Sequence, residues 1–414
     1  MNFDELKITL KRLYKEYVKY HFKRILLCLV LSIFVGLTTS ATAWLLDPAV
    51  KKIFIDKDVT LAWLIPLAII FTFTAKGLSL YFARLNILIV GQRIAGELQK
   101  KIAETILFSD VQTLDSRHSG KYIGNIMFDS GQVQNLVSTG VLNLMKDSFS
   151  AICLVGVMFY QNWKLAIFAI FMIPLAAGLA KNLGKKIGKV QGEAGEIAGN
   201  LTSFLSDIFR GSRMIRIYQK EDTENENATR VISSLIGKNI KIASIMIRAT
   251  PIMETLTGFM IAGFIFYSGK LINAGELEIN NFFSFLAAMM LAYQPIRSLA
   301  TIHMVAYQGG AAANRIFSVI DEPINIKDED HLPELQIKNC EIKFSNVNFK
   351  YKSTNEKAIN NINLKIEGGK ITALVGQSGA GKSTIINLIP RFYDPQDGEI
   401  TIDNQNTKKI RLKS

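Results

Sequence analysis

Six apolar stretches occur before residue 306 and predict membrane-spanning helices. A hydrocarbon core about 30 Å thick needs roughly 20 apolar residues per helix. Only Gln161 and Asn162 separate the third stretch from the fourth, which predicts a tight hairpin there. The pattern therefore predicts an all-α membrane domain over 1–320. Its candidate spans are 25–46, 61–83, 147–160, 163–180, 255–272 and 282–305.

Two connections between these spans are long and polar. Residues 84–146 and 181–249 contain little that would break a helix, and each joins an even-numbered span to an odd-numbered one. Both must therefore project on the same side of the membrane. A single helix over 61–108 would measure about 72 Å, more than twice the hydrocarbon thickness.

The chain beyond residue 320 has a different pattern. Residues 321–335 are acidic and contain two prolines, which predicts a polar linker. Short alternating segments come next and predict strands, and Lys382–Ile389 predicts a helix that Pro390 closes. We expect 336–414 to be the β-rich and P-loop part of an α/β nucleotide-binding domain. The predicted strands are Ile342–Tyr351, Ile359–Ile366 and Ile371–Val375.

A glycine-rich motif comes directly after the third predicted strand and fits the P-loop pattern G-x-x-x-x-G-K-[ST]. Its glycines let backbone N–H groups face phosphate oxygens, and the next helix presents its positive N-terminus to the same charge. Lys382 would contact the β- and γ-phosphates of ATP, and the Ser383 hydroxyl would bind Mg²⁺. The motif comprises Gly376, Gln377, Ser378, Gly379, Ala380, Gly381, Lys382, Ser383 and Thr384.

Composition supports a membrane protein. The net charge is +13, with a mean hydropathy of +0.21. The basic residues are spread between apolar helices and not gathered in one patch, which disfavours nucleic-acid binding. They suit surfaces that face anionic lipid headgroups. The three cysteines and four histidines are scattered and lack metal-ligand spacing.

Three cations fall inside the spans and are candidate substrate ligands, because charge is costly in a membrane. Lys76, Lys146 and Arg297 each lie about 21–23 Å from the outer face by residue count. The alternative is that each extends to the nearer headgroups. Glu254 lies at a similar depth and could pair with one of the three.

An aromatic ring upstream of the P-loop, in Val347-Asn348-Phe349-Lys350-Tyr351, could stack on adenine or pack in a small sheet. Together with the P-loop and the segment Leu388–Ile400, this stretch resembles the ABC exporters, in which six helices are fused to one nucleotide-binding domain. The likeness extends through the membrane part, notably Phe159–Leu165 and Gln294–Leu299, and is greatest to the bacterial lipid A flippase type.

The resemblance implies several roles. Tyr351 becomes an adenine platform, and Lys76, Lys146 and Arg297 become ligands for lipid phosphates. The segments 127–132 and 208–213 would be transverse coupling helices, with a bend over Ser109–Ser119. The family works as dimers, so we expect a homodimer in the cytoplasmic membrane with both termini in the cytosol, where ATP is found.

The sequence departs from the family pattern after Thr384. The family's glutamine loop, signature, Walker B acids and switch histidine are not found in the thirty residues beyond it. We therefore expect no catalytic residue in these 414 residues and no ATP hydrolysis by them alone. The favoured function is export of an anionic lipid. One alternative is a truncated or split-gene fragment, with a separately encoded remainder. The other is a multidrug or peptide exporter.

Overall fold

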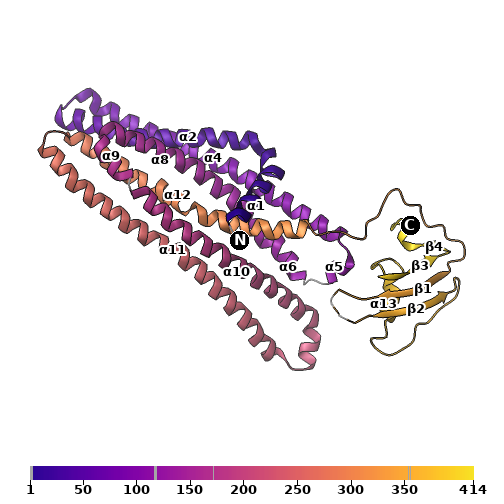
Figure 1. Ribbon diagram of the computed structural model, residues 1–414. Coiled ribbons are helices and arrows are strands. Elements are labelled where there is room, and N and C mark those ends of the chain that lie inside the picture. The colour runs from indigo at the N-terminus through magenta and orange to yellow at the C-terminus, as the bar shows by residue number, and fades with distance from the viewer. Residues whose placement is uncertain (1–2, 116–118, 171, 353, 355) are drawn as a thin grey trace. The chain divides into compact units, whose positions relative to one another are not determined.

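The computed structural model describes residues 3–115, 119–170, 172–352, 354 and 356–414, which group into two compact units (Figure 1). Unit 1 comprises Met1–Lys101 and Tyr122–Ser318. Unit 2 comprises Ile102–Lys121 and Val319–Ser414. The first is helical and the second is built on a small sheet. The sequence pattern placed all of 1–320 in one domain, but Ile102–Lys121 groups with the C-terminal unit.

The helices of unit 1 are long and mostly continuous. The predicted helix over 61–108 is confirmed as α4, which has 50 residues. The helices before it are α1 (Phe3–Glu16), η1 (Val18–His21), α2 (Phe22–Trp44), α3 (Leu46–Pro48) and η2 (Ala49–Ile55). The others are α4 (Val59–Phe108), α6 (Ser119–Gly124), η3 (Asn125–Asp129), α7 (Ser130–Asn135), η4 (Leu136–Gly140), α8 (Val141–Gln161), α9 (Trp163–Ile170), α10 (Met172–Ile217), α11 (Glu221–Asn273) and α12 (Ile279–Ile320).

Four helical stretches among the described residues are long and apolar enough to cross a membrane. They contain the predicted first, second, third and sixth spans, and they run over Val18–Ile53, Val59–Phe108, Tyr122–Gln161 and Ile279–Ile320. The fifth predicted span lies within α11. The fourth covers α9 and the start of α10, and its residue 171 lies outside the described residues.

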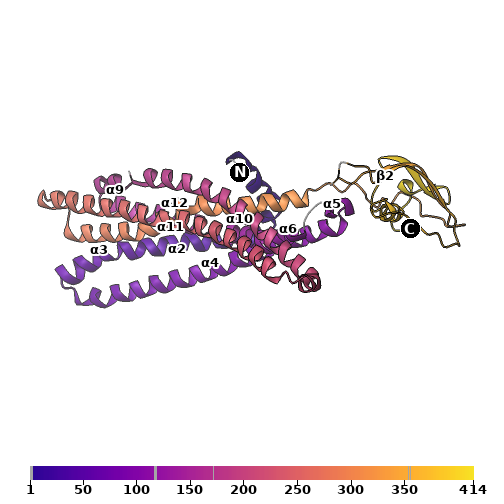
Figure 2. The ribbon, with the colours of Figure 1, turned by 90° about the horizontal axis from the view of Figure 1, so that it is seen from below.

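Two features show how unit 1 is held together. A core cluster joins α2, α8, α9, α11 and α12 around Phe264 and Phe285, whose rings stack with centroids 4.9 Å apart. In contrast, only 6% of the apolar window of α4 is buried. Figures 1 and 2 both show α10 and α11 side by side, joined by the turn Tyr218–Lys220. Burial within the chain therefore stabilises most helices, while α4 has an apolar surface left for lipid or another chain.

Unit 2 contains a four-stranded antiparallel sheet in the order β2-β1-β3-β4. One face carries a core that includes Phe344, Val347 and Ile385. The strands follow the predicted alternation, and the predicted helix begins at Lys382 as expected. The elements are β1 (Ile342–Phe349), β2 (Ile359–Ile366), β3 (Asp397–Ile402), β4 (Gln405–Asn406), the short helices α5 (Val111–Asp115) and α13 (Lys382–Leu388), and the turn η5 (Thr407–Lys409).

Asp403 fixes the start of β1 to the turn between β3 and β4. Its carboxylate accepts backbone N–H groups from Lys338, Glu341, Asn339 and Cys340 at 2.7–3.1 Å. These hydrogen bonds, led by the one from Lys338, lower the pKa of Asp403 to about 2. A charged carboxylate therefore organises the entry to the sheet.

The third predicted strand is wrong for the described structure. Residues 371–375 are irregular, and Ile371 and Val375 are 102% and 92% exposed. A strand needs a hydrogen-bonding neighbour, and no strand of the four-stranded sheet pairs with this segment. The apolar alternation identified a segment suited to a sheet, but pairing decides whether a strand forms.

Candidate functional site

The P-loop lies in unit 2 between the exposed segment 371–375 and α13. Gly379 and Gly381 have φ angles of 86° and 84°, a left-handed region that favours glycine. A Cβ on Gly381 would also lie 2.7 Å from the carbonyl oxygen of Ala358. The loop therefore requires glycine at both positions, as a phosphate-binding turn does.

Lys382 and Ser383 occupy positions that fit a phosphate and its cation. The Lys382 Nζ donates to the carbonyl oxygens of Gly376 and Gln377 at 2.9 and 2.7 Å, which holds the ammonium over the loop. Ser383 is exposed, and the next residue, Thr384, is buried. An anion at the loop could replace these carbonyl contacts of Lys382 and reach the Ser383 hydroxyl. The residues present thus fit a nucleotide phosphate with Mg²⁺.

Tyr351 connects the upstream aromatic segment to the P-loop. Its hydroxyl lies 3.1 Å from the Thr384 Oγ1, so the two side chains share a hydrogen bond. Its ring makes edge contacts with Phe349 and Tyr393, with centroids 4.9 and 5.3 Å away. The structure therefore brings the predicted adenine residue to the base of the predicted phosphate loop.

The predicted substrate cations lie in unit 1, on three different helices. Lys76 is on α4, and Lys146 is on α8, where it pairs with the neighbouring Asp147. Arg297 on α12 donates to the Thr250 Oγ1 at 2.7 Å. The hydrogen bonds and ion pairs of the described residues therefore give Lys146 and Arg297 partners within the protein and do not join the three cations directly.

A carboxylate that the sequence pattern did not assign lies beside Lys146. Asp147 is 1% exposed and forms an ion pair with Lys146. Glu254 is exposed, and the ion pairs of the described residues do not include it. The only sequence signal for Asp147 was its adjacency to Lys146 inside an apolar helix.

A second carboxylate, Asp110, joins the first long connection to the linker within unit 2. Asp110 is 7% exposed and accepts the backbone N–H groups of Asn325 and Ile326, both at 2.9 Å. The next residue, Val111, packs against the core of the sheet. Asp110 and Val111, in the segment predicted as a bend, therefore pack within the unit that holds the nucleotide sheet. Residues 116–118 of the expected bend lie outside the described residues.

The two segments predicted as coupling helices lie within unit 1. Residues 208–213 continue α10. In the other, Asp129 pairs with Arg315 of α12, with the Nε to Oδ2 distance at 3.0 Å. Asn125 donates to the same carboxylate at 2.8 Å. The guanidinium lies against Gly195 of α10, where a Cβ would come within 3.2 Å of it.

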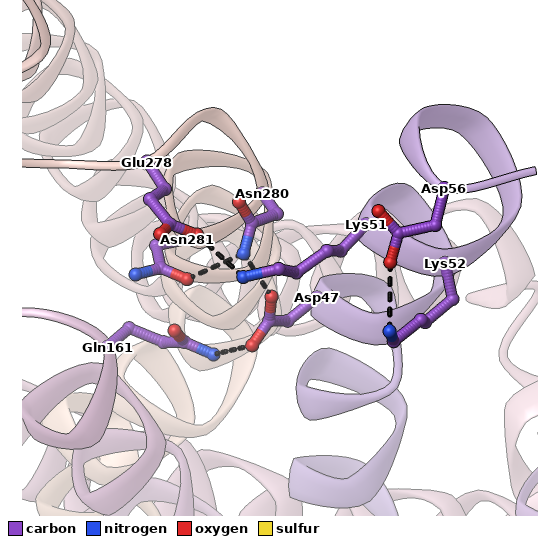
Figure 3. A network of polar contacts seen from close by, with 8 residues as sticks. All are labelled: Asp47, Lys51, Lys52, Asp56, Gln161, Glu278, Asn280 and Asn281. Atoms are coloured by element: carbon purple, nitrogen blue, oxygen red, sulfur yellow. Dashed lines mark hydrogen bonds and ion pairs between the residues drawn. The ribbon is translucent and has the colours of Figure 1, made fainter.

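At the other end of unit 1, where the short loops lie, polar side chains connect the ends of the helices (Figure 3). Asn280 donates to Asp47 at 2.6 Å, and Gln161 donates to Ser284 at 3.0 Å and to Asp47 at 3.4 Å. The Ser284 hydroxyl donates to the Ala43 carbonyl at 3.0 Å. We call these contacts, together with the exposed Lys51–Glu278 pair, the short-loop network. They join the ends of α2 and α8 to the start of α12.

Comparisons with sequence families agree with this architecture. A sequence profile described as ABC transporter transmembrane region matches residues 25–296. A second, described as ABC transporter, matches residues 359–414. Together the two profiles match most of the chain.

Individual relatives give the same result. The ATP-dependent lipid A-core flippase of Syntrophus aciditrophicus is 36% identical over 97% of this chain and 66% of its own length. The protein of the same name from Desulfotalea psychrophila is 34% identical over 99% and 71%. The chain thus spans about two thirds of the length of these relatives.

Among solved structures, a bacterial Atm1-family ABC exporter with ATP bound superimposes with a TM-score of 0.80. The superposition covers 95% of this chain and 69% of that one, at 18% identity, and it establishes the fold alone.

Proposed function

The chain belongs to the ABC transporters, and we propose that it is one subunit of a homodimeric exporter for an anionic, lipid A-like amphiphile. The cargo would cross the cytoplasmic membrane by ATP-driven alternating access. Because ATP is cytosolic, the P-loop unit and both long connections would face the cytosol. Six spans then leave both termini on that side.

The observation that carries this proposal is the placement of Lys76 and Lys146 on two helices that are long and apolar enough to cross a membrane. Ionisable groups in spans are costly and usually face a bundle interior or a cavity. Ammonium groups inside the spans would gain from an anionic ligand. Relatives named lipid A-core flippase match nearly the whole chain, which makes a lipid phosphate the favoured anion.

The exposed surface of α4 supports the homodimer. Only 6% of its apolar window is buried within one chain. A second copy would cover part of this surface and enclose the cations. Oligomers of identical chains with closed symmetry are the common solution to such a face.

The nucleotide roles follow the geometry of the loop. Lys382 would exchange its carbonyl contacts for β- and γ-phosphate oxygens, and Ser383 would hold Mg²⁺. Tyr351 would support the adenine through one ring face while its hydroxyl keeps Thr384 in place. When bound, ATP supplies the free energy that the conformational cycle needs.

The cargo is tested by titrating lipid A into the purified 414-residue chain in neutral detergent. We expect the Lys76→Gln, Lys146→Gln double variant to bind lipid A at least about tenfold more weakly, because two phosphate contacts are lost. Lys164→Gln, at an exposed pair with Glu276 in the short loops, is the matched control and should leave binding unchanged. Equal affinity in the double variant and the native chain would contradict the proposed cargo site.

The nucleotide site has a separate test with a fluorescent ATP analogue. Lys382→Ala should weaken Mg²⁺-dependent binding strongly. Tyr351→Phe should retain binding, and Tyr351→Ala should lose the preference for adenine over guanine. If Tyr351→Phe is as defective as Tyr351→Ala, the hydroxyl contact matters and the stacking role is wrong.

One observation favours a second candidate, a multidrug or peptide exporter. The buried Asp147 lowers the net positive charge near Lys146 and could itself attract a cationic ligand. In that case Asp147→Asn would weaken binding of an apolar cationic dye and strengthen binding of lipid A. The lipid proposal predicts only the second change.

A further inference from the structure

The N-terminal segment of the chain carries a lysine at every fourth position. Lys7, Lys11, Lys15, Lys19 and Lys23 run through α1, η1 and the first turn of α2. All five are exposed. In the part of the chain that the structure describes, none of the five forms an ion pair. We call this set the lysine row.

The opposite face of α1 is packed against unit 1, so the orientation of the helix is fixed. Leu6, Thr9 and Leu13 are buried, with 3–6% exposure. The Arg12 guanidinium lies 4.2 Å from the ring centroid of Phe317, near the end of α12. At about 100° per residue, Lys7, Lys11 and Lys15 lie on the side of α1 opposite to these contacts. The row therefore points outward.

The lysine row lies where the chain enters its first span. The apolar stretch Val18–Ile53 starts within the row. His21 approaches Glu97 of α4, with the Nε2 to Oε1 distance at 3.6 Å, which ties the turn to that helix. A segment that leads directly into a membrane helix lies at the level of lipid headgroups.

The exposed residues between the lysines also suit an interface. Tyr14, Tyr20 and Phe22 are 54%, 78% and 56% exposed, and Ile8 is 69% exposed. Tyrosine is enriched at membrane surfaces because its ring is apolar and its hydroxyl is polar. Asp4 shares the outward face of α1 and offsets one of the positive charges. Lysines interleaved with exposed aromatic rings favour a lipid surface over water alone.

We propose that the lysine row binds the headgroups of anionic phospholipids in the leaflet where the first span begins. Charge complementarity favours this ligand, because the row presents five positive ammonium groups and a membrane surface that contains anionic lipids is negatively charged. This site is distinct from the proposed cargo site, whose cations lie inside the spans on α4, α8 and α12. Because α1 also packs on Phe317, headgroups bound there stabilise the contact between α1 and the end of α12.

The test measures thermal unfolding of the 414-residue chain in neutral detergent doped with phosphatidylglycerol or phosphatidylcholine. Phosphatidylglycerol should raise the unfolding midpoint of the native chain, and phosphatidylcholine should not. Replacing all five lysines by glutamine should raise the half-saturating phosphatidylglycerol fraction at least about tenfold. Ionic strength of about 1 M, where the Debye length is about 3 Å, should abolish the response of the native chain.

Matched variants keep the result interpretable. Replacing the five lysines by arginine retains the charge and should retain the response. A control variant replaces five exposed lysines of unit 2 by glutamine and so changes the net charge by the same amount. It should leave the phosphatidylglycerol response unchanged. They are Lys327, Lys338, Lys343, Lys352 and Lys409. If the fivefold glutamine variant fails to fold, the triple variant at Lys7, Lys11 and Lys15 replaces it.

Two results would overturn the proposal. One is an unchanged phosphatidylglycerol response after the row is neutralised. The other is an oligonucleotide, added to the chain in detergent with phosphatidylcholine, that raises the unfolding midpoint as much as phosphatidylglycerol does. That result would indicate a general site for polyanions. The Lys76→Gln, Lys146→Gln variant should retain the phosphatidylglycerol response, so the cargo proposal and this one can fail separately.

Discussion

The two ends of the membrane unit are held together by different chemistry. At the short loops, the neutral amides of Asn280 and Gln161 donate to the Asp47 carboxylate, and Gln161 also donates to Ser284. At the end of the long connections, Asp129 and Arg315 form a charged pair with two hydrogen bonds, and Asp129 is 5% exposed. Both contacts join α12 to segments distant in the sequence.

The difference indicates which end should separate more readily. A hydrogen bond from a neutral amide to a carboxylate contributes about 1.5–3 kcal/mol. Asp47 is half-buried, so its carboxylate can turn toward water when such a bond breaks. Breaking a buried charged pair leaves an uncompensated charge. We therefore expect the short-loop end to open at lower cost than the Asp129–Arg315 end. In the alternating-access cycle proposed above, such an asymmetry would favour one closed state over the other.

The largest expected effect comes from Arg315→Ala. It leaves the buried Asp129 carboxylate with Asn125 as a remaining partner, and we expect a loss of about 3–5 kcal/mol of stability. Thermal unfolding in detergent measures it. Lys52→Ala, in the exposed Lys52–Asp56 pair at the other end, is the control and should cost less than about 1 kcal/mol. Similar losses in the two variants would remove the asymmetry.

The next effect tests packing near the same end, at Gly309 of α12. A Cβ at this position would lie 2.5 Å from the Leu136 Cβ, so Gly309→Ala requires a shift between α12 and η4. We expect destabilisation of about 1–3 kcal/mol. Gly156→Ala in α8 is the control, since nothing lies within 4 Å of its Cβ. It should be neutral or stabilising by up to about 1 kcal/mol. If Gly309→Ala and Gly156→Ala changed stability equally, the contact between α12 and η4 would not be closely packed.

At the short-loop end, Asn280→Ala should have a moderate effect. It removes the donor to the Asp47 Oδ1, while Gln161 still donates to the other oxygen at 3.4 Å. We expect a loss of about 1–2 kcal/mol, below that of Arg315→Ala. Hydrogen exchange at the start of α12 should rise with it. Asn281→Ala leaves the Asp47 contact in place and should change neither quantity by as much. A larger loss for Asn280→Ala than for Arg315→Ala would reverse the comparison.

How much of this asymmetry the sequence could predict depends on the range of the contacts. Apolar length predicted α4, alternation predicted β1 and β2, and the spacing of glycines predicted the P-loop, because each pattern is local. The Asp129–Arg315 pair joins residues 186 positions apart. Nothing near either residue marks the other as its partner.

The same limit explains two further differences. Segment 371–375 has the composition of a strand, but a strand forms only beside a neighbour. Asp110 lies in a segment predicted as a bend, and only the fold brings it to the backbone of Asn325 and Ile326. The lysine row was visible in the sequence, but the face that it occupies required the packing of Leu6 and Leu13.

The smallest expected effect concerns the exposed Lys51–Glu278 pair, whose Nζ to Oε2 distance is 3.0 Å. The hydrogen bond from Lys51 and its charge lower the pKa of the Glu278 carboxyl. A carboxyl with a lowered pKa stabilises the fold above its unfolded value, about 4.3, and this contribution is lost as the pH falls through the folded value. Glu278→Gln should therefore reduce the unfolding midpoint slightly at neutral pH and not at all well below about pH 4. Because both side chains are exposed, water and salt screen most of the interaction. Thermal unfolding at several pH values measures this change in the unfolding midpoint. The exposed Lys365–Glu341 pair of unit 2 is the matched pair for comparison. A loss in Glu278→Gln that does not change with pH would mean that Glu278 does not stabilise this end through its charge.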